Sequence, residues 1–296
     1  MTSAPALRAI LIAGPTASGK SALALEIAAE RGGIIVNADS MQVYRELAIL
    51  TARPTAADEA IATHRLYGHV PAARAYSVGQ WLNDVRGVID EAEATGRVPV
   101  IVGGTGLYFM ALLAGLSPIP EIPFEIRSAW RARGRSLPAH ELHRMLVECD
   151  PETAARTRPS DRQRVIRALE VIDATGRSLA EWQRTPGKPL LAEAEVERLV
   201  VEIERGALYR RCDDRFDRMM EAGALEEVCS LGGLDLSADL PAMRALGVAP
   251  LLAHLGGEMA LDDAVALAKR DTRHYVRRQA TWLARNMITW IRCCVK

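Results

Sequence analysis

The sequence lacks several features that mark particular classes of protein. Its 296 residues include only five cysteines, and no two of them form a Cys-x-x-Cys pair. This argues against a disulfide framework and against a zinc site, and it favours a reducing compartment. No charged segment followed by a long apolar segment opens the chain, and its early apolar run is too short to span a membrane. We therefore expect a cytoplasmic protein without membrane contact.

An excess of charge of one sign is also missing, because 37 Lys and Arg residues balance 37 Asp and Glu residues. This balance neither requires nor excludes a nucleic-acid partner, so the distribution of the charges must decide. Hydrophobic residues make up 49% of the chain, which at this length suits one large domain or two modest ones with a sizeable core.

The residues that follow the first apolar run, 10–13, form the clearest short motif. Their spacing is Gly-x-x-x-x-Gly-Lys-Ser and a helical pattern follows, which predicts the strand, loop and helix of a P-loop. Backbone N–H groups in such a loop, together with the positive end of the helix, favour an anion. Lys20 should reach terminal phosphate oxygens, and Ser21 should offer its hydroxyl to Mg²⁺. The predicted phosphate-binding residues are Gly14, Pro15, Thr16, Ala17, Ser18, Gly19, Lys20 and Ser21.

Two more predicted strands end in residues that suit a site. The run 33–38 stops at Asp39, and the run 97–102 stops at a glycine cluster that contains Thr105. Open α/β sheets bind ligands at the carboxyl ends of their strands, so we favour a site role for Asp39 over a helix N-cap. The glycine cluster is either a binding loop or a tight turn. Many P-loop ATPases end this strand with a magnesium-binding Asp, and its absence here argues against an ordinary ATPase.

The remaining patterns indicate an α/β fold with a helical insertion. Proline-rich segments flank a stretch that has helical patterns and no convincing strand, and a strand pattern returns at 198–204. We predict a parallel sheet flanked by helices, with 1–117 and 190–296 forming the core and 118–189 an inserted all-helical domain. The predicted helices are 56–66, 77–94, 124–134, 138–149, 151–157, 160–175, 207–230 and 261–285.

Basic side chains concentrate on two of these helices. In 160–175 they lie opposite an apolar stripe, which is the usual pattern of a solvated face. The helix 261–285 carries six basic residues with Tyr275 and Trp282 between them. Basic residues interleaved with aromatic ones suit an RNA backbone and stacked bases, although an amphipathic helix packed through its aromatic residues would give the same pattern.

Longer motifs add a family resemblance. In chain order, GPTASGKS, NADSMQVYR, TARPT, PVIVGGTGLYF, RPSDRQRVIRALEV and RRQATWLAR resemble motifs of the tRNA dimethylallyltransferases, also called tRNA isopentenyltransferases. The resemblance runs from about residue 9 to residue 285. It implies a P-loop NTPase-like core whose loop holds the diphosphate of a prenyl donor, and a helical insertion that grips the anticodon stem-loop. The zinc-finger extension of eukaryotic relatives is absent, which suggests the bacterial type.

The family transfers a dimethylallyl group from dimethylallyl diphosphate to N6 of the adenine 3′-adjacent to the anticodon, and the resemblance implies this activity here. By position, Asp39 matches the general base, Thr105 a contact to the target nucleotide, and Arg215 an arginine on the leaving diphosphate. Together with Mg²⁺, the cationic groups would stabilise the departing diphosphate while Asp39 accepts the N6 proton. The positions expected to contact tRNA are Asp39, Ser40, Met41, Gln42, Thr105, Arg127, Gln163, Arg164, Val165, Ile166, Arg167 and Arg278.

Two other functions stay open at this point. A nucleotide or small-molecule kinase would use a P-loop, Mg²⁺ and arginines in the same way, but it would consume ATP. A non-catalytic RNA-binding P-loop protein would bind tRNA and leave N6 unmodified, although Asp39 and Thr105 beside a diphosphate loop argue against it. Under the favoured interpretation the partners are tRNA and dimethylallyl diphosphate, and we expect a monomer.

Overall fold

The computed structural model describes residues 7–294, which form two compact units. The first unit joins the described residues up to Leu113 to those from Leu190 onward, and the second unit is Ala114–Pro189. The predicted insertion, 118–189, lies inside the second unit.

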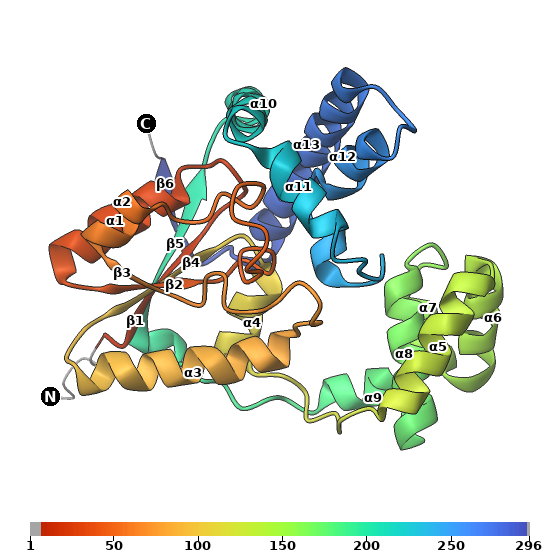
Figure 1. The fold of residues 1–296 in the computed structure, drawn as a ribbon. Helices are drawn as coiled ribbons and strands as arrows, with labels where there is room; N and C mark the ends of the chain where they lie inside the picture. The colour runs from red at the N-terminus through yellow and green to blue at the C-terminus, as the bar shows by residue number, and fades with distance from the viewer. Residues whose placement is uncertain (1–6, 295–296) are drawn as a thin grey trace, which may run out of the picture. The chain divides into compact units, whose positions relative to one another are not determined.

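The first unit is built on a six-stranded sheet in which all neighbouring strands are parallel (Figure 1). The strand order is β3-β2-β4-β1-β5-β6, so the strand that precedes the P-loop lies in the middle of the sheet. The middle strands are almost entirely apolar, as expected for strands covered on both faces. The strands are β1 (Ala9–Ala13), β2 (Ile34–Asn37), β3 (Thr63–Arg65), β4 (Pro99–Gly103), β5 (Val196–Glu202) and β6 (Ile291–Cys294).

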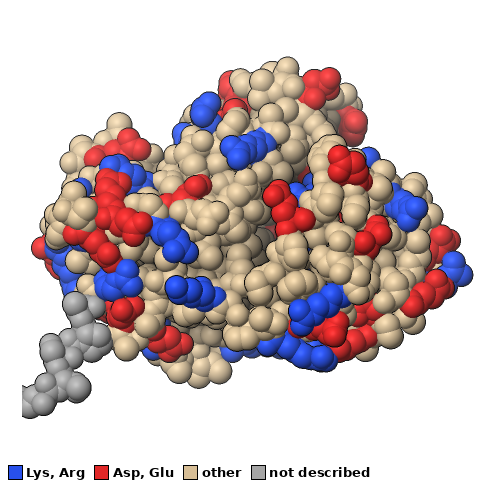
Figure 2. Space-filling model, turned by 90° about the horizontal axis from the view of Figure 1, so that it is seen from below, with Lys and Arg blue, Asp and Glu red and all other residues tan. Residues whose placement is uncertain are grey.

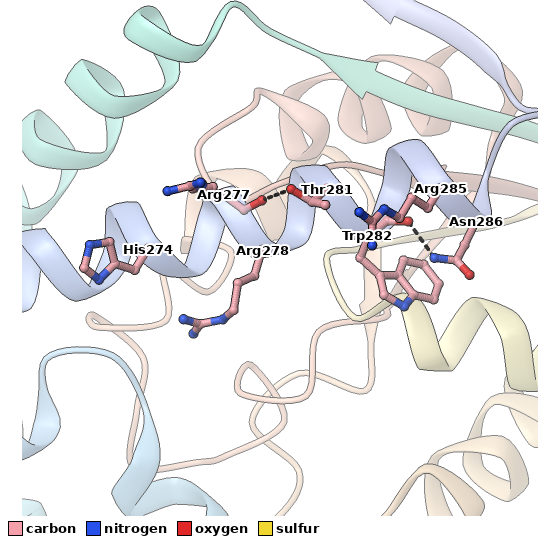
Figure 3. A pocket seen from close by; sticks show the side chains of 7 residues that line it. All are labelled: His274, Arg277, Arg278, Thr281, Trp282, Arg285 and Asn286. Carbon is pink, nitrogen blue, oxygen red and sulfur yellow. Dashed lines mark hydrogen bonds between the residues drawn. The ribbon is translucent and has the colours of Figure 1, made fainter. Parts of the chain in front are cut away.

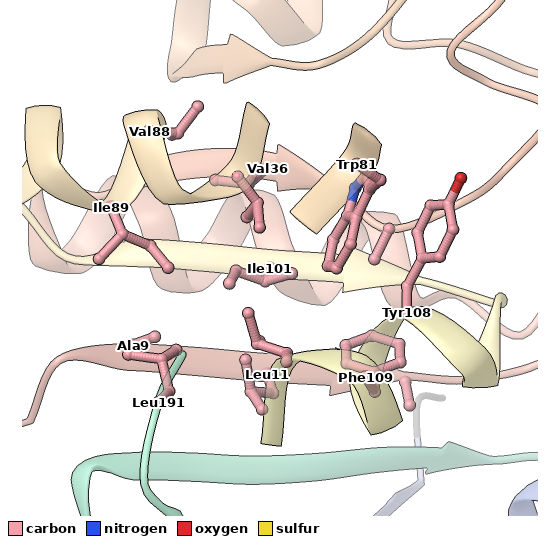
Figure 4. Close-up of a cluster of buried hydrophobic side chains, with 14 of the residues drawn as sticks. Ala9, Leu11, Val36, Trp81, Val88, Ile89, Ile101, Tyr108, Phe109 and Leu191 are labelled. Carbon is pink, nitrogen blue, oxygen red and sulfur yellow. The ribbon is translucent and has the colours of Figure 1, made fainter. Parts of the chain in front are cut away.

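Successive residues of a strand point to opposite faces of the sheet, so these apolar strands place apolar side chains on both faces. Helices cover both faces and bury them. On one face Leu11 packs in a cluster with Trp81 and Phe109 of α3 and α4 (Figure 4). On the other face Ile10 packs in a cluster with Ala24 of α1. The helices of the first unit are α1 (Lys20–Arg31), α2 (Ala56–Ile61), α3 (Val78–Ala94), α4 (Gly106–Ala114), α10 (Arg205–Glu221), α11 (Ala224–Gly232), α12 (Val248–Leu255) and α13 (Leu261–Asn286).

A further core joins α10, α11, α12 and α13 to the segment that follows β2. Tyr44 of that segment is buried in one cluster with Phe216 and Val248. Glu227 of α11 holds the same segment, because its carboxylate accepts hydrogen bonds from the three successive N–H groups of 48–50, at 2.6, 2.7 and 2.9 Å. The segment after β2 is therefore fixed by packing and by a charge-assisted cap.

The second unit is a group of five helices with its own small core. Leu142, Val165 and Leu169 are buried there beside Trp130. Its helices are α5 (Phe124–Ser136), α6 (Ala139–Cys149), α7 (Pro151–Arg156), α8 (Arg162–Thr175) and α9 (Leu179–Arg184).

Asp150 fixes the start of two helices in the second unit. Its side chain is almost completely buried and accepts hydrogen bonds from the Thr153 N–H, at 3.1 Å, and from the Ser178 hydroxyl, at 2.8 Å. Burial alone would raise the pKa of Asp150, but these hydrogen bonds outweigh it and the pKa lies below its ordinary value. The ionised carboxylate is therefore part of the folded structure.

The chain leaves the first unit and returns to it at one place. The N–H groups of Leu190 and Leu191 both donate to the carbonyl of Leu112, at 2.9 and 3.3 Å. The segments that precede and follow the insertion are thus tied together on the first unit.

Several predicted elements are corrected by the structure. The helix predicted at 56–66 ends at Ile61, because the backbone becomes extended at Ala62 and the next three residues pair with β2 as β3. The helix predicted at 207–230 is two helices, since Gly223 adopts a left-handed φ of 98° between α10 and α11. The helices α4, α9 and α12 and the strand β6 were not predicted.

The surface and the cysteines agree with the composition. On the face shown in Figure 2, basic and acidic side chains are interspersed. All five cysteines are free thiols. Across residues 7–294, no helix combines the length and the apolar character that crossing a membrane requires.

Candidate active site

The P-loop curls between the end of β1 and the start of α1. Ala17 and Gly19 adopt left-handed backbone conformations, with φ of 63° and 95°. The first amides of α1 have no carbonyl acceptor within the helix. The N–H groups of Lys20 and Ser21 are therefore helix-end donors of the kind that binds phosphate, at the positive end of the helix dipole.

Other N–H groups of the loop are already bonded to acceptors of the protein. The Gly14 N–H donates to a carbonyl of β4 at 3.3 Å, and the Ser18 N–H donates to the Pro15 carbonyl at 3.2 Å. The Thr16 N–H donates to the side chain of Gln279 at 3.0 Å, and Pro15 has no N–H group. These four residues shape the cradle, and the donors for an anion come from later in the loop.

Lys20 lies partly buried at the beginning of α1. Its Nζ donates to the Pro15 carbonyl at 3.3 Å, so the ammonium group lies over the loop. Burial lowers the pKa of Lys20 to about 8, the negative charge of Asp39 opposes this, and the positive charge of Arg215 adds to it. An anionic ligand would therefore stabilise the ammonium form of Lys20 strongly.

A tight turn at the end of β2 holds Asp39. The buried side chain of Asn37 accepts the Asp39 N–H at 2.8 Å and donates to the carbonyls of Asp39 and Leu66, at 2.9 and 3.0 Å. Asn37 is itself fixed from α3, because the indole of Trp81 donates to its carbonyl at 2.8 Å. One carboxylate oxygen of Asp39 accepts the Met41 N–H at 2.9 Å, and the other takes no part in the turn.

Thr105 joins this turn to the end of β4. Its hydroxyl oxygen accepts the Ser40 N–H at 3.0 Å, and its own N–H donates to the Ala38 carbonyl at 3.2 Å. The predicted neighbours Asp39 and Thr105 are thus brought together. The side chain of Gln42 is bonded to a different segment: its amide donates to the carbonyls of residues 51 and 52, both at 2.9 Å.

The charge of Asp39 reaches several side chains from separate elements. Burial lowers the pKa of the Arg215 guanidinium in α10, and the charge of Asp39 opposes this shift. Burial raises the pKa of Tyr67, Tyr108 and Tyr275, and the charge of Asp39 raises each further. The three phenols therefore stay protonated. Sequence reasoning noted Tyr275 only as an aromatic residue among basic ones and gave the other two no role.

A groove runs along α13 with a volume of about 520 Å³ (Figure 3). Arg278 lies over the ring of Tyr275, 5.7 Å from its centroid. The Trp282 ring packs so closely on Gly106 that a Cβ there would meet it at 2.0 Å. The groove is lined by His274, Arg277, Arg278, Thr281, Trp282, Arg285 and Asn286.

The second unit carries the other predicted tRNA contacts, and their side chains differ in how far they reach the surface. Val165 is completely buried in the core of that unit, so its side chain has no surface to offer. Ile166 also packs inward, onto Gly134 of α5. Arg164 and Arg167 reach the surface, paired with the carboxylates of Asp161 and Glu170 at 3.2 and 3.5 Å. Exposed Gln163 and partly buried Arg127 complete the set.

Ser21 is one of the residues that line a cavity of about 190 Å³. Across residues 7–294, no group of three or more His, Cys, Asp or Glu side chains is arranged to hold a metal ion. Mg²⁺ keeps water or substrate phosphates as most of its ligands. A single hydroxyl at the P-loop therefore fits a magnesium ion that binds together with a diphosphate.

Comparisons with known proteins agree with this geometry. The model of the IPP transferase family matches residues 42–286, and that of the isopentenyl transferases matches residues 7–74. A tRNA dimethylallyltransferase of Azorhizobium caulinodans is 51% identical over 284 residues, covering 96% of this chain and 91% of its own length. One from Chelativorans sp. is 54% identical over 275 residues, covering 93% and 94%.

Two solved structures are similar in fold as well. The tRNA isopentenylpyrophosphate transferase of Bacillus halodurans has a TM-score of 0.69 and 31% identity, covering 96% of this chain and 89% of its own. A eukaryotic dimethylallyltransferase acting on tRNA has a TM-score of 0.79 and 27% identity, covering 93% and 69%. The chain combines a P-loop with a carboxylate at a nearby strand end, and its relatives match it along nearly the full length. It therefore belongs to the tRNA dimethylallyltransferase family.

Proposed function

We propose that this chain transfers a dimethylallyl group from dimethylallyl diphosphate to N6 of the adenine 3′-adjacent to the anticodon in tRNA and releases diphosphate. The names of the relatives favour this reaction over that of a kinase. The observation that carries the proposal is the position of Asp39 at the end of β2, where its charge acts on both Lys20 and Arg215. A carboxylate that could serve as the base thus accompanies cationic groups that suit a diphosphate.

The cationic groups would stabilise the leaving group. As the allylic C–O bond breaks, its electron pair leaves with the diphosphate, and negative charge develops there. The helix-end N–H groups of α1, the ammonium of Lys20 and the guanidinium of Arg215 would bind this charge. Because Lys20 and Arg215 are buried enough to have lowered pKa values, their charges act in a poorly hydrated site where electrostatic interactions are strong.

Asp39 would act on the acceptor. The lone pair of N6 forms the new C–N bond, and the proton that N6 then carries in excess passes to the carboxylate. The adenine reaches the carboxylate only after extrusion from the stacked anticodon loop. Thr105, whose hydroxyl is already fixed by the Ser40 N–H, would hold the extruded base at the junction of the two strand ends.

Magnesium and tRNA complete the proposal. Bound Mg²⁺ would neutralise charge on the diphosphate, and the hydroxyl of Ser21 would hold it. The α13 groove, through Arg278 and its neighbours, and the exposed polar residues of α8 would contact the tRNA. The groove combines guanidinium groups with a Trp ring, which suits phosphates and bases of a single-stranded loop. We propose that the protein acts as a monomer in the cytoplasm.

The direct test is mass spectrometry of nucleosides after incubating the protein with Mg²⁺, dimethylallyl diphosphate and unmodified tRNA. The proposal predicts an adenosine with one added dimethylallyl group, mapped to the position beside the anticodon. A parallel reaction with ATP in place of the donor should give neither ADP nor modified tRNA. If the protein binds tRNA and leaves every adenosine unmodified, it is a binding protein and the proposal is wrong.

A further inference from the structure

One buried side chain connects α13 to both loops of the site. Gln279 is only 7% exposed. Its side-chain oxygen accepts the Thr16 N–H of the P-loop at 3.0 Å, and its side-chain nitrogen donates to the Gly104 carbonyl at 3.0 Å. Both bonds are buried and join residues that lie 263 and 175 positions away in the sequence.

These contacts specify a primary amide. The backbone N–H of Thr16 needs an acceptor, and the carbonyl of Gly104 needs a donor, so one group must supply both. The fit is tight, because a Cβ on Gly104 would lie 2.3 Å from the Gln279 amide nitrogen. Gly104 therefore leaves the space that the amide fills. A carboxylate would keep the first bond and set its second oxygen against the Gly104 carbonyl.

The two loops that meet at this amide hold different substrates under the proposed function, on which this inference rests. Thr16 lies in the diphosphate loop, and Gly104 directly precedes Thr105 at the acceptor side. One turn further along α13, Trp282 packs on Gly106, so the same helix contacts the acceptor loop on both sides of Thr105. The relative position of the two loops is thus set by α13 as well as by the sheet.

We propose that Gln279 is a positioning residue that fixes the diphosphate loop and the acceptor loop at the separation that the transfer requires. It touches neither substrate in this proposal. Its loss should therefore lower the rate of transfer between bound substrates more than it weakens the binding of either one. Small displacements of reacting groups reduce rates by up to about a hundredfold.

The decisive variant is Gln279→Glu, because its side chain has nearly the same shape and its hydrogen-bonding capacity changes with protonation. The neutral acid accepts the Thr16 N–H and donates its O–H to the Gly104 carbonyl, as the amide does. Burial and the facing carbonyl should hold the pKa of this introduced carboxyl above its ordinary value. Transfer by Gln279→Glu, measured relative to the unchanged protein, should therefore recover as the pH falls.

The assay is single-turnover transfer at saturating tRNA and donor from about pH 8 to about pH 5.5, expressed as the ratio of the variant rate to the unchanged protein's rate. Cys212 of α10 also lies at the site, because its thiol donates to the Thr16 carbonyl at 4.0 Å. The titratable groups of the site are common to both proteins, so their effects largely cancel in the ratio; they are Lys20, Asp39, Tyr67, Tyr108, Cys212, Arg215 and Tyr275. At the upper end we expect a rate lowered by about tenfold to a hundredfold, and at the lower end a ratio at least several-fold higher. Gln279→Met, which has no donor, should show a low ratio at every pH.

Thr272→Ala is the matched structural control. Thr272 is buried two turns earlier on α13, and its hydroxyl bonds only within the helix, to the Ala268 carbonyl at 2.8 Å. This variant should lower the melting temperature and leave single-turnover transfer unchanged. A pH-independent ratio for Gln279→Glu, or a rate loss in Thr272→Ala equal to that in Gln279→Met, would overturn the inference. Absence of transfer by the unchanged protein would instead refute the proposed function.

Discussion

Asp39→Asn removes the proposed base and keeps the turn that holds it. The amide oxygen of the variant can still accept the Met41 N–H, which in the structure is 2.9 Å from the carboxylate. The bonds between residues 37 and 39 use the backbone of Asp39 and are unaffected. Folding and tRNA affinity should therefore change little. Asp39→Ala would lose the Met41 bond as well, which is worth about 1 kcal/mol.

The expected effect on the chemical step is large. General base catalysis contributes about 10²–10⁴ to a rate, or roughly 2.7–5.5 kcal/mol of the barrier. A smaller effect has the same sign: without the charge of Asp39, the pKa of Lys20 falls further below its value of about 8, and less of the lysine is protonated. Measurement at pH 6.5 with saturating donor isolates the loss of the base.

The assay is single-turnover transfer of labelled dimethylallyl to tRNA, with tRNA binding measured in parallel. Asp90→Asn, which changes an exposed carboxylate on α3, is the control and should behave as the unchanged protein does. A transfer rate of Asp39→Asn within about fivefold of the unchanged protein would show that Asp39 is not the base, since it falls outside the range for general base catalysis.

Three further predictions concern Lys20, Glu227 and Asp150. The pKa of Lys20 is about 8, and an anionic ligand needs its charge. The Kd for the prenyl donor should therefore rise above pH 8 by up to about tenfold per pH unit. Lys20→Arg should remove this slope in calorimetric titrations. Glu227→Ala leaves three N–H groups of 48–50 without their carboxylate acceptor, so urea denaturation should give a free energy of unfolding lower by about 2–4 kcal/mol. The pKa of Asp150 is lowered in the folded protein, so its ionised carboxylate stabilises the second unit at pH values above the unfolded-state pKa of about 4. This stabilisation is lost as the pH falls through the folded-state pKa. Asp150→Asn should therefore lower the melting temperature at pH 7, and the difference from the unchanged protein should shrink below about pH 4, as followed by circular dichroism.

Much of the first unit was predictable because its signals are local. The P-loop spacing and the apolar runs around 10–13, 33–38 and 97–102 are properties of short segments, and the middle strands follow them closely. The proximity of Asp39 and Thr105 was also expected, since parallel strands end on the same edge of a sheet.

Other parts depended on contacts that a short segment does not encode. β3 and β6 are edge strands of three and four residues, and they form only because a neighbouring strand offers an edge. The role of Gln279 requires two partners that are distant in sequence, and the burial of Val165 depends on how α8 packs within its unit. The glycine at 223 was visible in the sequence, but whether it ends a helix is decided by the backbone angle that the fold imposes.

The bond from Leu190 to Leu112 has a practical consequence. Since the two connecting segments are pinned at adjacent points, a short glycine-serine bridge could replace Ala114–Pro189 without stretching the remaining chain. Such an excised protein would retain the sheet, the phosphate cradle and α13. It would give a minimal scaffold in which affinity for prenyl diphosphates is measured without the proposed RNA contacts of the second unit, and onto which foreign helical modules could be grafted.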